Sequence, residues 1–129
     1  MVKKNKIIIS VLVVFLIVVI GVFKFSFSSG YKISIDNNTN KTIENLELKY
    51  YVGNTIKTIS QIEPQKSWKY NIDTNSIQGE NAIIVTYKDN KGNSYEESVV
   101  GYLEKGYSGK SNVVINKIDD NGKLEIEVK

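Results

Sequence analysis

The chain has 129 residues, of which 41% are hydrophobic and 24% charged, and its formal net charge at pH 7 is +3. It contains neither cysteine nor histidine, which excludes disulfide bridges, thiol catalysis, Ser-His-Asp chemistry and ordinary zinc sites. All 17 basic residues are lysine, so no guanidinium group can bind phosphate or carboxylate in a bidentate manner. This usage is typical of an AT-rich genome and indicates a Gram-positive bacterium.

The uncharged segment IIISVLVVFLIVVIGVF fills residues 7–23 and predicts a transmembrane helix. At about 1.5 Å per residue it covers roughly 25 Å, so we extend the predicted anchor in the lipid bilayer to residues 7–27, with Lys24 reaching the interface. Lys3, Lys4 and Lys6 precede the segment, and basic flanks stay preferentially in the cytoplasm. Residues 1–6 are therefore predicted to be cytoplasmic, and the domain after the anchor extracytoplasmic.

A cleaved signal peptide is the alternative reading of the same N-terminal pattern. Ser28, Ser29 and Gly30 are small residues suited to cleavage, which would release the rest of the chain as a secreted protein. We favour an uncleaved anchor, with residues 28–30 as a linker, because the apolar segment exceeds the usual signal-peptide core of about 7–15 residues. Phe25 and Phe27 also make a poor approach to a cleavage site, and the lack of cysteine excludes a lipoprotein anchor.

The basic charge belongs to the flanks of the anchor. Without the lysines at positions 3, 4, 6 and 24, the chain carries thirteen lysines and fourteen acidic residues, a net charge of about −1. A nucleic-acid partner needs a clustered basic surface, so none is expected. Residues 31–129 suffice for one domain with its own core.

Short strands separated by turn signals follow the anchor. The second is typical, because Leu46, Leu48, Tyr50 and Val52 alternate with polar residues and should share the buried face. Trp68 opens the fourth strand and is expected to anchor the core. In chain order, the predicted strands cover residues 31–36, 43–52, 56–62, 68–72, 81–88, 95–103, 111–118 and 123–128, with a polar loop at 73–79 and hairpin turns at 89–93 and 119–122. This pattern predicts an all-β fold: an immunoglobulin-like β-sandwich of seven to eight strands preceded by one N-terminal transmembrane helix.

One segment also resembles a known family. Residues 37–72, NNTNKTIENLELKYYVGNTIKTISQIEPQKSWKYNI, resemble the extracytoplasmic Ig-like or FxLYD-type modules of Gram-positive membrane proteins and lipoproteins. In those modules an Asn- and Thr-containing turn precedes an apolar-alternating strand, an Ile-x-Pro-x-x-Ser turn and a strand that begins with an aromatic residue. The matching residues are Asn38, Thr42, Leu46, Leu48, Tyr50, Ile62, Pro64, Ser67, Trp68 and Tyr70. Where the family has aromatic-x-Leu-Tyr-Asp, this chain has only the rough counterpart Leu48-Lys49-Tyr50-Tyr51, and the resemblance implies fold and location more than activity.

The segment GYLEKGYSG, residues 101–109, is the strongest candidate for a contact surface. Its three glycines make the backbone permissive, and Tyr102, Leu103 and Tyr107 provide large side chains, of which tyrosine buries much area at little entropic cost. The alternative is structural, with Tyr102 and Leu103 completing the sixth strand in the core. Tyr51, on the strand face opposite Tyr50, is a further candidate.

Two functions remain open, and neither is enzymatic. The first is a membrane-anchored extracytoplasmic binding module without catalytic activity, whose partner is an unidentified extracytoplasmic protein or peptide. The second is an immunity protein that protects its producer against a secreted bacteriocin or toxin. No catalytic, cofactor-binding or metal-binding residues are predicted, because the acidic pairs are not arranged for acid-base chemistry: Glu96 and Glu97, for example, are neighbours on one strand and point to opposite faces.

Overall fold

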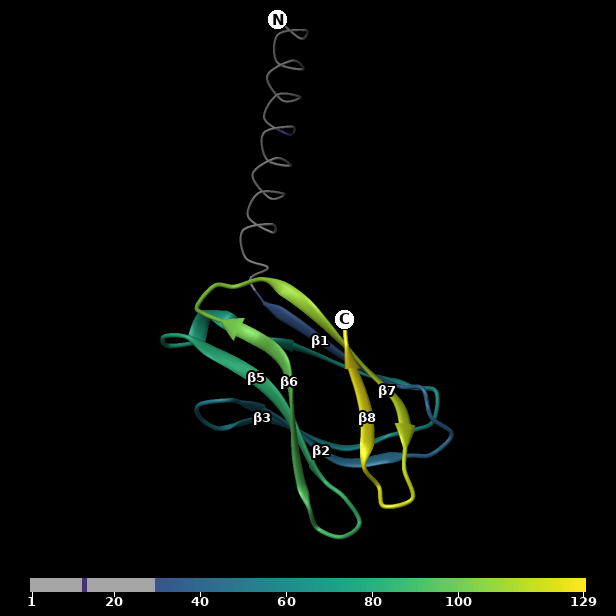
Figure 1. The fold of residues 1–129 in the computed structure, drawn as a ribbon. Coiled ribbons are helices and arrows are strands. Elements are labelled where there is room, and N and C mark those ends of the chain that lie inside the picture. The colour runs from purple at the N-terminus through teal and green to yellow at the C-terminus, as the bar shows by residue number, and fades with distance from the viewer. Residues whose placement is uncertain (1–12, 14–29) are drawn as a thin grey trace, which may run out of the picture.

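The computed structural model describes Val13 and residues 30–129. The described chain forms eight strands and one short 3₁₀ helix (Figure 1). In order they are β1 (Tyr31–Asn37), β2 (Ile43–Tyr50), β3 (Thr55–Ile62), β4 (Ser67–Ile72), η1 (Thr74–Ser76), β5 (Asn81–Lys88), β6 (Ser94–Leu103), β7 (Gly109–Ile118) and β8 (Leu124–Val128). The prediction of seven to eight strands after residue 30 is confirmed with eight, and every boundary lies within two residues of the expected one.

The strands form two sheets of four. One sheet has the order β4-β1-β7-β8 and the other the order β3-β2-β5-β6. All neighbouring strands are antiparallel except β1 and β7, which run parallel. The consecutive strands β1 and β2 therefore lie in different sheets, so the chain crosses from one sheet to the other between residues 37 and 43.

One hydrophobic cluster joins the two sheets. Alternate residues of each inner strand point into it, as the period of two requires. Its fully buried side chains include Ile33 and Ile35 of β1, Leu46 and Leu48 of β2, Ile83 and Val85 of β5, Leu103 of β6, and Val113 and Ile115 of β7. The predicted all-β fold is thus confirmed at the level of two sheets around a common core.

Two side chains expected in the core lie closer to solvent. Val52 is 70% exposed, because β2 ends at Tyr50 and Val52 falls in the following turn. Trp68 is only half-buried, since β4 is an edge strand of its sheet, and its ring stacks on Tyr70 with 5.7 Å between ring centroids. The exposure of Val52 thus follows from where β2 ends, and that of Trp68 from the position of β4 at the edge of its sheet.

The buried amide of Asn37 fastens the crossing between the sheets. Its Nδ2 donates to the carbonyl oxygens of Lys41 at 2.8 Å, Ile62 at 2.9 Å and Glu63 at 3.1 Å. Its Oδ1 accepts from the backbone N–H of Thr39 at 3.0 Å and from the Thr39 hydroxyl at 2.7 Å. One side chain of β1 therefore satisfies polar groups of the β1–β2 loop and of the end of β3 in the opposite sheet.

The β5–β6 and β7–β8 hairpin turns lie at the end of the domain opposite the start of β1. Both turns have the same hydrogen-bond pattern. Each begins with an aspartate, Asp89 or Asp119, whose Oδ1 accepts backbone N–H groups of the residues two and four positions later. Each contains a glycine with positive φ, Gly92 at 83° and Gly122 at 84°, as expected of three-residue hairpin loops. The turns also touch, because the Asn90 N–H donates to the Asn121 carbonyl at 2.8 Å.

Hydroxyl groups add further links between the sheets. The Tyr87 hydroxyl, on β5, accepts from the Leu124 N–H at 3.0 Å and donates to the Leu124 carbonyl at 3.4 Å. The Ser111 hydroxyl, on β7, donates to the Val99 carbonyl of β6 at 2.7 Å. The Tyr87 hydroxyl thereby satisfies the N–H and carbonyl of Leu124 at the start of β8, which is an edge strand.

The predicted anchor, residues 7–27, lies outside the described residues apart from Val13, as do the residues on both sides of it up to position 29. Within the described residues, no helix combines the length and apolar character needed to cross a bilayer.

Replacing Asn37 by alanine should lower the free energy of unfolding by about 2–4 kcal/mol, because several buried polar groups lose their partner at once. Chemical unfolding of the full chain, followed by the fluorescence of Trp68, measures the loss. Asn38→Ala is the matched control, since Asn38 is exposed and should change stability by less than about 0.5 kcal/mol. Equal effects of the two substitutions would contradict the role of the Asn37 amide.

Alanine at Gly122 should destabilise the domain more than alanine at Gly92. Both positions have positive φ, which costs an L-residue about 1–2 kcal/mol. A Cβ at Gly122 would also lie 2.8 Å from Asn90 Oδ1, whereas a Cβ at Gly92 meets nothing within 4 Å. Thermal unfolding of both variants measures the difference, and a larger loss for Gly92→Ala would refute the contact between the turns.

Candidate functional site

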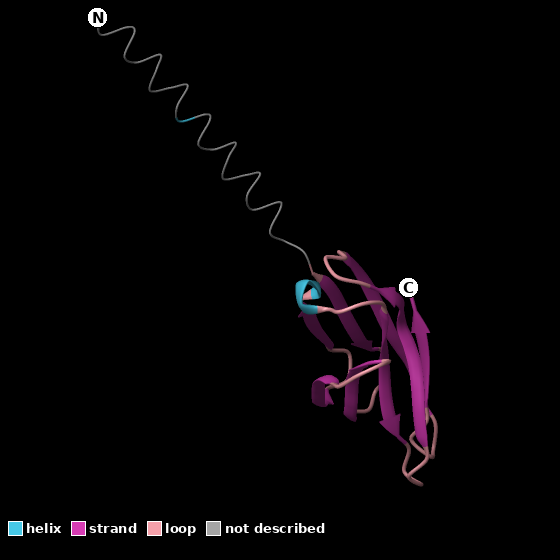
Figure 2. Ribbon diagram, turned by 90° about the vertical axis from the view of Figure 1, so that its left-hand side faces the viewer, coloured by secondary structure: helices cyan, strands magenta, loops and turns pink. Residues whose placement is uncertain are grey.

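The candidate residues gather at the end of the domain where β1 starts. Tyr31, the first residue of β1, pairs with Gly109 at the start of β7, so the β6–β7 loop lies beside the entry of the chain into the domain (Figure 1). The 3₁₀ helix lies at the same end, because Tyr31 also pairs with Ile72, which precedes it (Figure 2). The β4–β5 and β6–β7 connections therefore meet there, and the β2–β3 turn contacts the start of β5 through Asn81.

Tyr102 and Tyr107 form an edge-to-face pair at this end. Their ring centroids lie 5.5 Å apart and the ring planes meet at 61°. The two side chains remain 43% and 38% exposed. We call these two residues the tyrosine pair. It presents two aromatic surfaces whose mutual contact restricts their rotation.

The hydroxyl of Tyr102 lies between two carboxylates. Its Oη is 3.0 Å from Glu80 Oε1 and 3.1 Å from Glu104 Oε2. Hydrogen bonding to Glu80, followed by burial and by Glu104, raises the pKa of Tyr102 well above its ordinary value. The phenol therefore stays protonated and serves as a donor, which fixes the ring against the residues that flank β5 and β6.

Thr74 of the 3₁₀ helix holds the β6–β7 loop in place. Its hydroxyl, which is fully buried, donates to the Tyr107 carbonyl at 2.6 Å, and its own carbonyl accepts from the Gly106 N–H at 3.1 Å. The Tyr107 N–H donates to the Glu104 carbonyl at 3.1 Å, and Gly106 adopts a positive φ of 80°. Thr74 was not predicted as a functional residue, because it lies in a segment interpreted only as a polar loop.

Tyr51 is the most isolated of the candidates. It is 67% exposed in the β2–β3 turn, next to the exposed Val52. The Asn81 side chain fixes this turn, because its Oδ1 accepts from the Val52 N–H at 3.1 Å and its Nδ2 donates to the Val52 carbonyl at 2.8 Å. Tyr51 borders a shallow depression of about 400 Å³, which is also lined by Ala82, Ile84, Glu96, Ser98 and Gly101. The depression thus extends from Tyr51 to the residue before Tyr102.

Leu103 leaves the set of candidate contact residues. It is fully buried in the core, because Tyr102 and Leu103 are neighbours on β6 and point to opposite faces. The structural alternative considered for residues 101–109 therefore holds for Leu103, while Tyr102 and Tyr107 stay at the surface.

Several carboxylates of the described domain are engaged in local hydrogen bonds. Asp73 accepts from the Asn75 N–H at 3.0 Å, and Glu80 interacts with Tyr102, so these two acids serve different partners. Asn93, followed by backbone N–H groups and Tyr95, lowers the pKa of Asp89, which fits its role as an acceptor in the turn. A hollow of about 820 Å³ beside the two hairpin turns has a mixed lining, with Ile43, Ile118 and Leu124 among polar side chains. Within residues 30–129, no three His, Cys, Asp or Glu side chains lie together as metal ligands would.

Comparison with known proteins gives one structural likeness. No family model matches the chain, and no curated protein matches it. A solved structure, the NMR structure of a protein from Eubacterium rectale, is similar with a TM-score of 0.51 and 18% sequence identity. The match covers 78% of this chain and 89% of that one, and it concerns the fold alone.

Thr74→Val should destabilise the β6–β7 loop and lower the free energy of unfolding by about 1–3 kcal/mol, since the Tyr107 carbonyl loses its partner while the side-chain volume is kept. Hydrogen exchange of the Gly106 and Tyr107 amides should accelerate most. Thr55→Val, at an exposed position of β3, is the control and should leave the loop unchanged. Unaltered exchange in the Thr74 variant would show that this residue does not fix the loop.

Proposed function

We propose that this chain is a single-pass, membrane-anchored extracytoplasmic interaction module without catalytic activity. The observation that carries the proposal is the tyrosine pair, which is exposed and positioned by hydrogen bonds at one end of the domain. Tyrosine combines a large apolar surface with a polar tip and loses few rotamers on binding, so it is favoured at protein interfaces. The proposed partner is an extracytoplasmic protein or peptide.

The contacts of the tyrosine pair support this proposal energetically. Association is weakened when side chains and loops must be ordered on binding. Here the Tyr102 ring is held through its hydroxyl and the Tyr107 backbone through Thr74, so much of that ordering has occurred before any partner arrives. The depression beside Tyr51 provides an adjoining apolar area on the outer face of the second sheet.

The proposed fold type is an immunoglobulin-like β-sandwich of the FxLYD kind, spanning residues 31–129. Two four-stranded sheets around one core and the resemblance of residues 37–72 support it. In constant-type immunoglobulin domains the first two strands are neighbours in one sheet, whereas β1 and β2 belong to different sheets here. The proposed likeness therefore concerns the two-layer architecture, because the strand order of this domain differs from that of constant-type immunoglobulin domains.

The proposed location rests on the sequence before the domain. Residues 7–27 serve as the anchor, residues 1–6 stay in the cytoplasm with their three lysines, and residues 28–30 link the anchor to β1. The domain then faces the outside of the cell membrane.

A photoreactive phenylalanine analogue in place of Tyr107, in a C-terminally tagged full chain, should crosslink to one discrete protein or peptide in producing cells. The same analogue at Asp120, in the turn at the opposite end of the domain, is the control and should give no such product. The additional substitution Tyr102→Ala should reduce the Tyr107 crosslink severalfold, because it removes one of the two rings of the tyrosine pair. Equal crosslinking from both positions would contradict a defined interaction surface.

Protease added to intact cells completes this test by reporting the side of the membrane. The tag should be lost from the membrane fraction on protease treatment. A tag that stays membrane-bound and protected would place the domain in the cytoplasm and overturn the proposed location.

A further inference from the structure

The outer face of the sheet β4-β1-β7-β8 carries an uneven distribution of charge. Burial of Ile33, Ile35 and Trp68 directs the intervening side chains of β1 and β4 outward, and the buried Val113 and Ile115 do the same for β7. The outward residues at the end where β1 starts include four lysines: Lys32 on β1, Lys69 on β4, Lys110 on β7, and Lys129 directly after β8. We call this group the lysine face.

The strand register places these lysines close together. Lys32 lies directly opposite Lys110 in the parallel pair of β1 and β7. The next row of the same face contains Lys69 and Asn112, each opposite Ser34, and Lys129 is hydrogen-bonded to Asn112 through the backbone. Two lysines in register on one face concentrate positive charge there, so an anion bound beside Lys32 and Lys110 would be attracted by both.

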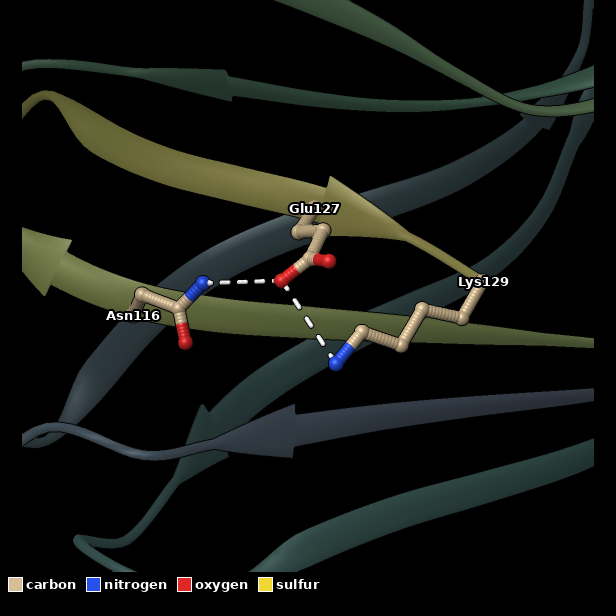
Figure 3. Close-up of polar contacts among 3 residues, drawn as sticks. All are labelled: Asn116, Glu127 and Lys129. Carbon is tan, nitrogen blue, oxygen red and sulfur yellow. Dashed lines mark hydrogen bonds and ion pairs between the residues drawn. The ribbon is translucent and has the colours of Figure 1, made fainter.

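The acidic residues Asp36 and Glu127 lie one row further from the start of β1 and approach two of the four lysines. Lys129 Nζ is 3.6 Å from Glu127 Oε2, and the same carboxylate accepts from Asn116 at 3.4 Å (Figure 3). Lys69 lies near Asp36 and is among the groups that lower the pKa of that carboxyl, after the hydrogen bond from Ser67. Within the described chain, no ion pair includes Lys32 or Lys110, and both side chains are exposed. The positive charge at the start of β1 is thus uncompensated.

The distance to the membrane follows from the sequence. Four residues lie between Phe27, the last residue of the predicted anchor, and Lys32, so the five steps from one Cα atom to the other span at most roughly 17 Å even in a fully extended chain. The headgroup layer itself takes up about 5–7 Å of this distance. Lys32 therefore lies at most about 10–12 Å from the lipid headgroups, a distance comparable to the Debye length of about 8 Å at physiological ionic strength.

We propose that the lysine face docks the domain onto the anionic surface of the bilayer that holds its own anchor. The ligand is the phosphate of anionic lipid headgroups, which suits lysine as a flexible point charge. Docking would place Lys32 and Lys110 against headgroups and relieve their mutual repulsion. This proposal rests on the anchor proposed above, because only the anchor brings the face near a bilayer.

The test uses the full chain in lipid vesicles and exploits the absence of cysteine. Asn71→Cys places one label on the outer face, in the same row as Lys32, and Lys91→Cys places one in the β5–β6 turn at the opposite end. Lipids with a quencher on the headgroup then report proximity. We expect strong quenching at position 71 and little at position 91 in vesicles containing phosphatidylglycerol, and loss of the difference at about 1 M salt, where the Debye length is about 3 Å.

Charge variants separate docking from simple tethering. The double variant Lys32→Gln with Lys110→Gln should shift the equilibrium between docked and undocked domains by about fivefold for each lysine replaced. The double variant Lys88→Gln with Lys66→Gln is the matched control, with the same change in net charge at exposed lysines outside the lysine face, and should leave quenching unchanged.

The other outcomes would refute docking, the anchor or the choice of ligand. Equal quenching in neutral and anionic vesicles, unchanged by the Lys32 and Lys110 substitutions, would show that the tether alone sets the position and would refute docking. Absence of quenching at position 71, in protein that still floats with the vesicles, would refute docking and leave the anchor intact. Protein that does not float with vesicles would refute the anchor itself. Binding of soluble polyphosphate without quenching by anionic vesicles would assign the lysines to another polyanion.

Discussion

The side-chain amide of Asn37 joins the two sheets at the point where the chain leaves one and enters the other. Because β1 and β2 lie in different sheets, the residues between them have no strand ladder to satisfy their backbone. Asn37 supplies both the donors and the acceptor that this crossing lacks, and its backbone binds the β3–β4 turn through Lys66 and Gln65. The connection between the two sheets at this crossing therefore depends on one buried polar side chain.

The two ends of the domain are fixed by different means, and this difference determines where function can reside. At the end distant from the start of β1, Asp89 and Asp119 use their carboxylates inside their own turns, and the turns bind each other. Those groups have little capacity left for a ligand. At the end where β1 starts, Thr74 and the Tyr102 hydroxyl fix the backbone and one ring, while two tyrosine faces stay in solvent. A rigid support with exposed aromatic groups is the arrangement that an interaction surface requires.

The sequence predicted the strands well because each inner strand alternates apolar and polar residues, as β5 shows with Ile83, Val85 and Tyr87 inward. It could not predict which strands pair, since alternation carries no information on neighbours. For that reason the edge position of β4, and with it the partial exposure of Trp68, was missed. Thr74 and Asn37 were missed because their importance comes from partners about 25 to 33 residues away in the chain. Leu103 and Tyr102 illustrate the limit of the site prediction, since neighbours on a strand face opposite sides and only one could be exposed.

The net charge of the domain does not reveal the lysine face, on which the docking proposal rests. Residues 31–129 carry almost equal numbers of lysines and acidic residues, so composition alone indicates a neutral domain. The parallel pairing of β1 with β7 brings Lys32 opposite Lys110, two lysines that are 78 positions apart, and the acidic Glu127 lies further from the start of β1 on the same face. In the proposed arrangement this separation orients the domain on the bilayer by long-range attraction, which is weak for each lysine and requires no pocket. The outer face of the other sheet, with the depression beside Tyr51, then points away from the membrane. The lysine face and the tyrosine pair lie at the same end of the domain but contain different residues. A substitution at Lys32 or Lys110 would therefore change presentation of the tyrosine pair without changing its contacts.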